Sequence, residues 1–168
     1  MNDAELHLVV NHVPVIGALL SVPLLLLTLL SRRQGRGVLR ASVLVMVLTG
    51  VGAVAAQLTG EPAEEYVEDL PGTYEHAIHE HEENAELATI LAVLTALLGL
   101  GAVVVAERRE LVPPILVGAM LAGSTVTAGA MALTGSVGGE IRHPEAREDA
   151  PVVPPHHEDD DEDEDDDD

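Results

Sequence analysis

The sequence LATILAVLTALLGLGAVVVA, residues 87–106, decides the fold of this chain because none of its side chains is charged. A helix rises about 1.5 Å per residue, so a stretch of this length crosses the roughly 30 Å hydrocarbon core of a membrane. Three further apolar stretches of similar length lie at 8–30, 38–58 and 111–133. We therefore predict an all-α integral membrane protein, built as a bundle of four transmembrane helices.

Basic residues and histidines separate along the chain. All eight basic residues are arginines, and six of them lie in or beside the first and third connections, whereas the second connection has none. Because positively charged connections stay in the cytoplasm, this pattern predicts a multi-pass protein of the inner, cytoplasmic membrane. Both termini and the second connection then face outward, to the periplasm. All eight histidines lie on that outer side.

The net charge of −21 comes largely from the C-terminal end, which closes with eleven consecutive acidic residues. Such a segment cannot bury apolar surface, so we predict a membrane domain at 1–147 and a disordered acidic tail at 148–168. The acidic composition excludes a nucleic-acid partner. The absence of cysteine excludes disulfides and thiolate metal sites. The absence of lysine beside so much acid suits a halophile, although a GC-rich genome explains it equally well.

The two halves of the chain follow one order: histidine, apolar stretch, arginine connection, apolar stretch, Thr-Gly. The first half ends in Thr59-Gly60 and the second in Thr134-Gly135. We therefore predict that the bundle consists of two duplicated helical hairpins, with both Thr-Gly ends and both histidine-bearing helix starts at one outer rim.

Three groups of residues at this rim are the candidate site. His12 lies inside an apolar stretch, where a polar side chain usually has a partner in the bundle. His81, Glu82 and Glu83 precede the third stretch, and a carboxylate beside an imidazole can orient it toward a metal. The last group follows a glycine pair that allows the chain to fold back toward the rim: Arg142 and His143.

These motifs together resemble a family of small bacterial four-helix membrane proteins of uncharacterised function. The resemblance covers about residues 6–145 and rests on His12, Thr59-Gly60, the His81-Glu82-Glu83 stretch, and the Gly138-Gly139 pair followed by His143. The chain departs from the pattern in having Asn11-His12-Val13-Pro14 where a His-Phe-Pro sequence is typical. Relatives of that family occur fused to or beside c-type cytochromes, so the resemblance implies a membrane domain with a haem or redox role.

The leading functional hypothesis is a b-type haem protein that transfers electrons at the outer face. Two imidazoles from different helices would hold the iron, with His12 and His81 as the preferred pair and His143 as the substitute. Arg142 would contact a haem propionate. A quinol and a periplasmic cytochrome would be the redox partners.

Two alternatives stay open. One is a non-haem zinc, iron or copper site formed by imidazoles and carboxylates, whose ligands would be His12, His81, His143, Glu82 and Glu83. The other is an accessory subunit of a homo-oligomer or larger membrane complex, in which these groups only satisfy one another. In all three cases we expect an electron carrier or accessory protein in the lipid bilayer, with no catalytic residue of its own.

Overall fold

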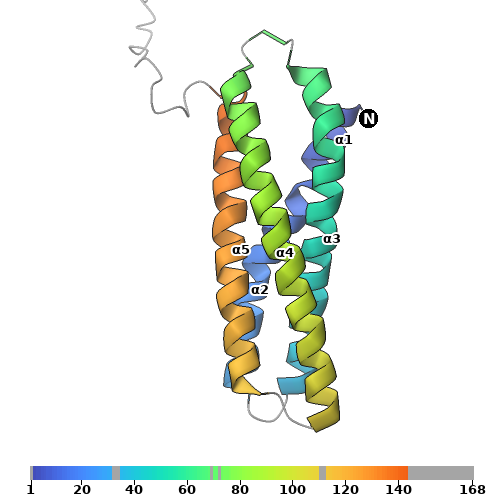
Figure 1. The fold of residues 1–168 in the computed structure, drawn as a ribbon, viewed down its shortest axis with the longest axis vertical. Coiled ribbons are helices and arrows are strands. Elements are labelled where there is room, and N and C mark those ends of the chain that lie inside the picture. Colours follow the sequence, from blue (N-terminus) through green and yellow to red (C-terminus); the bar gives the residue numbers. More distant parts are fainter. Residues whose placement is uncertain (1, 32–34, 69, 72, 110–112, 144–168) are drawn as a thin grey trace, which may run out of the picture.

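The computed structural model describes residues 2–31, 35–68, 70–71, 73–109 and 113–143 (Figure 1). Across these ranges the chain forms helices and no strand. The helices are α1 (Asp3–Val10), α2 (His12–Leu30), α3 (Gly35–Val67), α4 (Glu75–Arg109) and α5 (Pro114–Glu140). Four helical segments are long and apolar enough to cross a membrane, with α1 and α2 together forming the first. The predicted four-helix architecture is confirmed, while the predicted acidic tail lies outside the described residues.

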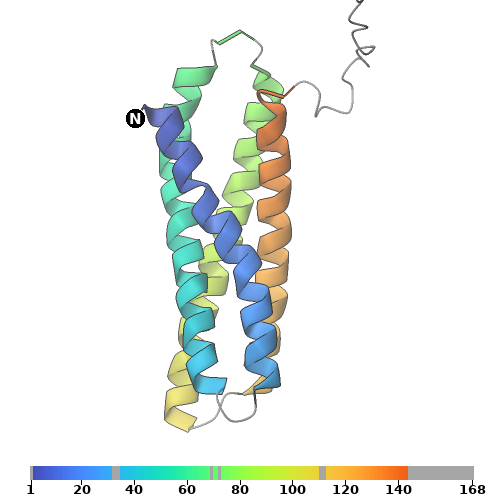
Figure 2. The ribbon, with the colours of Figure 1, turned by 180° about the vertical axis from the view of Figure 1, so that it is seen from behind.

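The four long helices form a closed ring in which each packs against two neighbours. Both α2 and α4 contact α3 and α5. Figure 2 shows α1 and α2 running diagonally from the upper part of α3 to the lower part of α5. We call the end that contains α1, the end of α3, the start of α4 and the end of α5 the histidine end. The opposite end, which carries Arg36, Arg40 and Arg108, is the arginine end.

The helices extend well beyond the apolar stretches. The sequence predicted a connection at 60–86, but α3 continues to Val67 and α4 begins at Glu75, so most of that region is helical. The acidic and alanine residues there are tolerated in a helix exposed to water. At 33 and 35 residues, α3 and α4 are about 50 Å long, which exceeds the hydrocarbon thickness. Their ends therefore project past the apolar layer.

The first span is two helices and not the single helix predicted at 8–30. Asn2 caps α1 through a capping box with Glu5, and α1 ends at Val10. Pro14 follows closely and lacks the N–H that a continuous helix would use to bond the Val10 carbonyl. The chain therefore turns at Asn11 before α2 begins.

Small side chains allow the helices to pack closely, and large ones face outward. Toward the histidine end the buried core consists mainly of alanines, among them Ala18, Ala53 and Ala92. Toward the arginine end it contains larger residues such as Leu25 and Met120. Many leucines on the outer surface are more than half exposed. This distribution is typical of helices that associate inside lipid, where apolar surface has no need to be buried within the protein.

At the arginine end, one carboxylate joins two helices. Glu107 near the end of α4 accepts hydrogen bonds from the guanidinium groups of Arg36 and Arg40 at the start of α3, at 2.5 Å each. Arg40 donates a second bond from Nε at 3.1 Å. These three groups are partly exposed, so the ion pairs contribute modestly to stability and chiefly fix how the two helices lie at this end.

Candidate functional site at the histidine end

In the first half of the chain, a histidine of α1 contacts the Thr-Gly end of α3. The Nδ1 atom of His7 lies 3.1 Å from the hydroxyl oxygen of Thr59. That hydroxyl also lies 3.1 Å from the carbonyl oxygens of Ala55 and Ala56, to which it donates. Because the Thr59 hydroxyl proton already bonds these carbonyls, the Thr59 oxygen can accept a hydrogen bond from Nδ1 of His7.

The second half repeats the arrangement with different atoms. His81 of α4 donates from Nδ1 to the carbonyl oxygen of Thr134 on α5, at 2.8 Å, because a carbonyl can only accept. The rings of His81 and His7 meet edge to face, with centroids 6.4 Å apart. Each Thr-Gly end therefore binds the histidine that begins its own half. The two histidines meet between the halves and tie α1, α3, α4 and α5 together.

Gly138 makes room for His81. A Cβ added at Gly138 would lie 2.8 Å from Nδ1 of His81, whereas one added at neighbouring Gly139 would meet nothing within 4 Å. Replacing Gly138 with alanine must therefore displace the imidazole from the Thr134 carbonyl. We expect Gly138→Ala to cost about 1 kcal/mol from the lost hydrogen bond, observed as a lower melting temperature in detergent and an altered ¹⁵N shift of His81 Nδ1.

Gly139→Ala is the matched control for this experiment. It makes the same chemical change one residue further along the same helix and should leave both readouts unchanged. Equal effects of the two substitutions would show that Gly138 has no special relation to His81.

A pair of carboxyl groups lies between α3 and α4 at the same end. The carboxyl groups of Glu64 and Glu82 lie close enough for a hydrogen bond, which forms when one of the two carries a proton. Glu64 lies six residues beyond the apolar stretch 38–58, outside the membrane-spanning part of α3. The hydrogen bond with Glu82, partial burial and the charge of Glu82 raise the pKa of Glu64, while nearby His79 opposes the rise. The pair thus includes a carboxylate that is more basic than usual.

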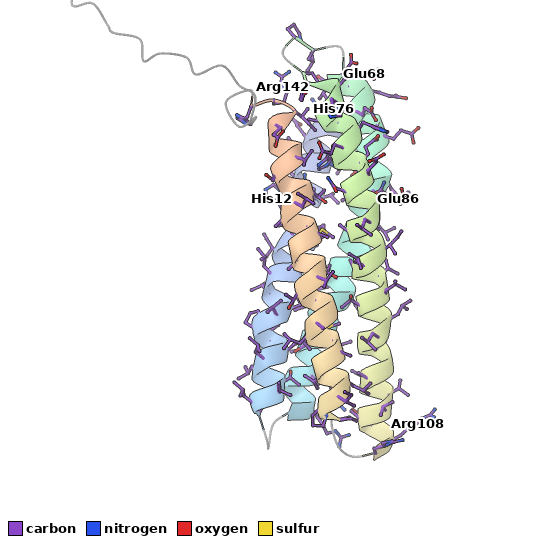
Figure 3. All side chains as sticks on the ribbon, turned by 60° about the vertical axis from the view of Figure 1, so that its left-hand side comes forward. His12, Glu68, His76, Glu86, Arg108 and Arg142 are labelled. Carbon is purple, nitrogen blue, oxygen red and sulfur yellow. The ribbon has the colours of Figure 1, made fainter. Side chains whose placement is uncertain are left out.

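The segment after α5 closes this end of the bundle. Arg142 donates from Nη1 to the Pro71 carbonyl and lies within reach of the Thr73 hydroxyl, at 3.2 Å each. The backbone N–H of Tyr74 donates to the carbonyl of Ile141 at 3.2 Å. Figure 3 shows Arg142 at this end with Glu68 and His76, and Arg108 at the opposite end. A cation is therefore fixed at the same end as the carboxyl pair.

The structure groups the predicted residues differently from the sequence hypotheses. His12 is exposed, and its Nδ1 is bonded to the Leu8 carbonyl one turn back, while the imidazole that meets His81 is that of His7. Glu83 is exposed and pairs with His79 at 3.4 Å, and His143 is exposed beyond the end of α5. In the part of the chain that the structure describes, no three histidine, aspartate or glutamate side chains are arranged to hold a metal ion.

The predicted rim included both Thr-Gly ends, but the candidate site residues did not include four residues that meet there: His7, Thr59, Glu64 and Thr134. The repeated Thr-Gly ends were the signal for the two histidine contacts, since each histidine binds the Thr-Gly end of its own half. No sequence signal connected Glu64 with Glu82, because their approach depends on the register between α3 and α4.

Comparison with known families identifies the chain. The family model of glycosyltransferase family 87 matches residues 12–140, which is most of the membrane bundle. The chain belongs to glycosyltransferase family 87. No curated protein and no solved structure matches it. As a member of family 87 with four membrane-crossing helices, it is a multi-pass membrane protein in contact with the lipid bilayer.

Membership of family 87 corrects several predictions. The resemblance to a cytochrome-associated family of uncharacterised function was wrong, because the family model that matches residues 12–140 is that of glycosyltransferase family 87. The haem electron-transfer hypothesis and both alternatives, a metal-binding protein and an accessory subunit, were wrong for the same reason. The expectation that the chain is not an enzyme was also wrong, since family 87 is a family of glycosyltransferases.

The predicted cofactors are corrected as well. Haem has no role in a family-87 glycosyltransferase, and the zinc, iron or copper alternative finds no grouped ligands among the described side chains. At His12, the first residue of α2, the Nδ1 atom is already bonded to the Leu8 carbonyl of α1.

Proposed function

We propose that this chain transfers a sugar from an activated donor to an acceptor hydroxyl at the histidine end of the bundle. Membership of a glycosyltransferase family supports the type of reaction. The observation that carries the assignment to this end is the carboxyl pair of Glu64 and Glu82. Sugar transfer to a hydroxyl needs a base, and carboxyl pairs supply acid and base groups in sugar chemistry.

Glu64 acts as the general base in this proposal. When the pair is fully ionised, the carboxylate of Glu64 takes the proton of the acceptor hydroxyl as the oxygen bonds to the anomeric carbon of the donor sugar. At the same time the bond from that carbon to the leaving group breaks, and its electron pair departs with the leaving group. Glu82 raises the pKa of Glu64, which makes Glu64 a stronger base near neutral pH.

The positive charge at this end suits an anionic leaving group. Arg142 uses Nη1 for its contacts with Pro71 and Thr73, and a guanidinium has further N–H donors that could face a departing phosphate. This role replaces the haem propionate contact predicted for Arg142. His143 lies beside Arg142 at the same end, where an acceptor would approach.

The arginine distribution supports an outward position for this site. Arg36, Arg40 and Arg108 lie at the arginine end, which the positive-inside rule places in the cytoplasm. The histidine end would then face the periplasm, and the membrane would be the cytoplasmic one. The partners are accordingly a sugar donor and a hydroxyl acceptor, and the quinol and periplasmic cytochrome required for electron transfer are set aside.

A transfer assay with membranes tests this function. Membranes that contain the full chain are supplied, in separate reactions, with a tritiated hexose on a lipid phosphate and on a nucleoside diphosphate. We expect label to move from one of these donors to a membrane glycolipid or glycan only when the chain is present. Identical labelling in membranes that lack the chain, with both donors, would contradict the proposal.

A further inference from the structure

A small cavity at the centre of the bundle is lined by hydroxyl groups from all four long helices. It offers about 10 Å³ through which the centre of a water molecule can move. Its walls include two alanines and a methionine together with five hydroxyl side chains: Ser21, Thr49, Thr95, Ser124 and Thr127. These hydroxyl residues are at most 8% exposed and lie midway along the apolar segments, far from both ends of the bundle.

The hydroxyl of Ser124 differs from the other four. Ser124, only 2% exposed, makes no hydrogen bond to any described residue. Leaving a buried hydroxyl unsatisfied in an apolar environment is costly, so such a group normally has a partner. Serines on helices usually bond the carbonyl one turn back, as Ser21 does with Gly17. Ser124 makes no such bond, so its hydroxyl can donate to a group inside the cavity that it lines.

The other hydroxyls present the complementary atoms. Ser21, Thr49 and Thr127 each donate their proton to a carbonyl of their own helix, at 2.8 to 2.9 Å. Thr95 lies 3.4 Å from Thr127 and can donate to it. The oxygen lone pairs of Ser21 and Thr49 therefore remain as acceptors, and the Ser124 hydroxyl remains as a donor.

We propose that this cavity binds one water molecule. The water accepts a hydrogen bond from the Ser124 hydroxyl. It donates one hydrogen bond to the oxygen of Ser21 and one to the oxygen of Thr49, which gives the three hydrogen bonds typical of a buried water. The cavity volume suits one molecule of this size. A cation is disfavoured because no lining side chain is charged, and burying an unpaired charge is far more costly than burying water.

This water would fix the relative depth of three helices at once. Its partners come from α2, α3 and α5, while α4 joins through the contact between Thr95 and Thr127. All of these bonds form only when every helix is at its native height. A bound water of this kind thus favours one bundle register over others that bury similar apolar surface.

Substitution of Ser124 gives opposite results with and without water. If water is bound, Ser124→Ala removes one of its partners and should lower the melting temperature of the detergent-purified protein by about 2–4 °C. If the cavity is dry, the same change removes an unsatisfied hydroxyl and should raise the melting temperature. Ser136→Ala, at an exposed position of α5, is the control for the altered helix propensity.

A direct measurement tests the site without a variant. Full-length protein labelled with ¹³C at serine and threonine is reconstituted in bilayers, and magnetisation is transferred from water by solid-state NMR. We expect Ser124 and Thr49 to receive it faster than Thr28 and Ser42, which are buried but bond each other at 3.1 Å. Equally slow transfer at all four residues, or a higher melting temperature for Ser124→Ala than for Ser136→Ala, would overturn the proposal.

Discussion

Glu64→Gln should reduce sugar transfer by about 10²- to 10⁴-fold, which is the usual contribution of a general base. An amide has the size of the carboxyl group and can still hydrogen-bond to Glu82, so the packing of α3 against α4 should persist. What is lost is the ability to take a proton. The measurement is the initial rate of label transfer in membranes with equal amounts of each variant.

Glu82→Gln should have a smaller effect on the rate and a distinct effect on its pH dependence. Since the hydrogen bond and the charge of Glu82 raise the pKa of Glu64, removing the charge should lower that pKa. The acid limb of the pH–rate profile would then move to lower pH, because Glu64 would lose its proton earlier. Glu64 would also become a weaker base, which lowers the maximal rate.

Glu61→Gln and Glu86→Gln are the matched controls. Both residues are exposed, and they lie on α3 and α4 within one turn or so of the pair. The same loss of one negative charge there should leave both the rate and the pH profile unchanged. If all four substitutions reduced transfer equally, the effect would come from the general charge of this end, and Glu64 would not be the base.

Gly17→Ala should destabilise the bundle by about 1–3 kcal/mol, the range for inserting a methyl group into a well-packed core. A Cβ at Gly17 would overlap the hydroxyl of Thr49 and lie 3.3 Å from its Cβ. Thr49 is held in place by its bond to the Val45 carbonyl, so α2 and α3 must separate. Thermal unfolding in detergent, followed by circular dichroism, measures this as a lower melting temperature.

Two further variants separate this steric effect from a general effect of glycine. Gly129→Ala places a methyl group where nothing lies within 4 Å, so the better helix propensity of alanine should make it neutral or stabilising. Adding Thr49→Ala to Gly17→Ala removes the overlapping hydroxyl and should recover part of the loss. Strict additivity of the two changes would mean that the contact between Gly17 and Thr49 is not the cause.

The fold could be predicted from the sequence because a long uncharged stretch in a membrane satisfies its backbone hydrogen bonds by forming a helix. The run at 87–106 needed no tertiary information to be recognised as a span. The helix ends were harder to place. Glu75 to Glu86 is polar enough to read as a connection, yet α4 already includes it, because a helix can continue into water once the membrane segment has nucleated it.

The site was only partly predictable. His81 was correctly located at one end of the bundle, but its partner there is His7 and not His12. The spacing of residues along the chain does not contain this pairing, because it depends on how α1 packs against α3. Similarly, the pairing of Glu64 with Glu82 depends on how α3 and α4 align, which the spacing of residues within one helix does not contain.

The lengths of α3 and α4 set the height of the carboxyl pair above the apolar layer, and this height matters for the proposed reaction. Glu64 and Glu82 each stand five or six residues beyond the apolar stretch of their helix, which is about 7–9 Å along the axis. That distance corresponds to the layer of lipid headgroups. A sugar attached to a membrane-anchored carrier would be presented at this height without leaving the bilayer, while an acceptor could arrive from the water above. Shortening either helix by a turn would lower the carboxyl pair toward the hydrocarbon and separate it from both reactants.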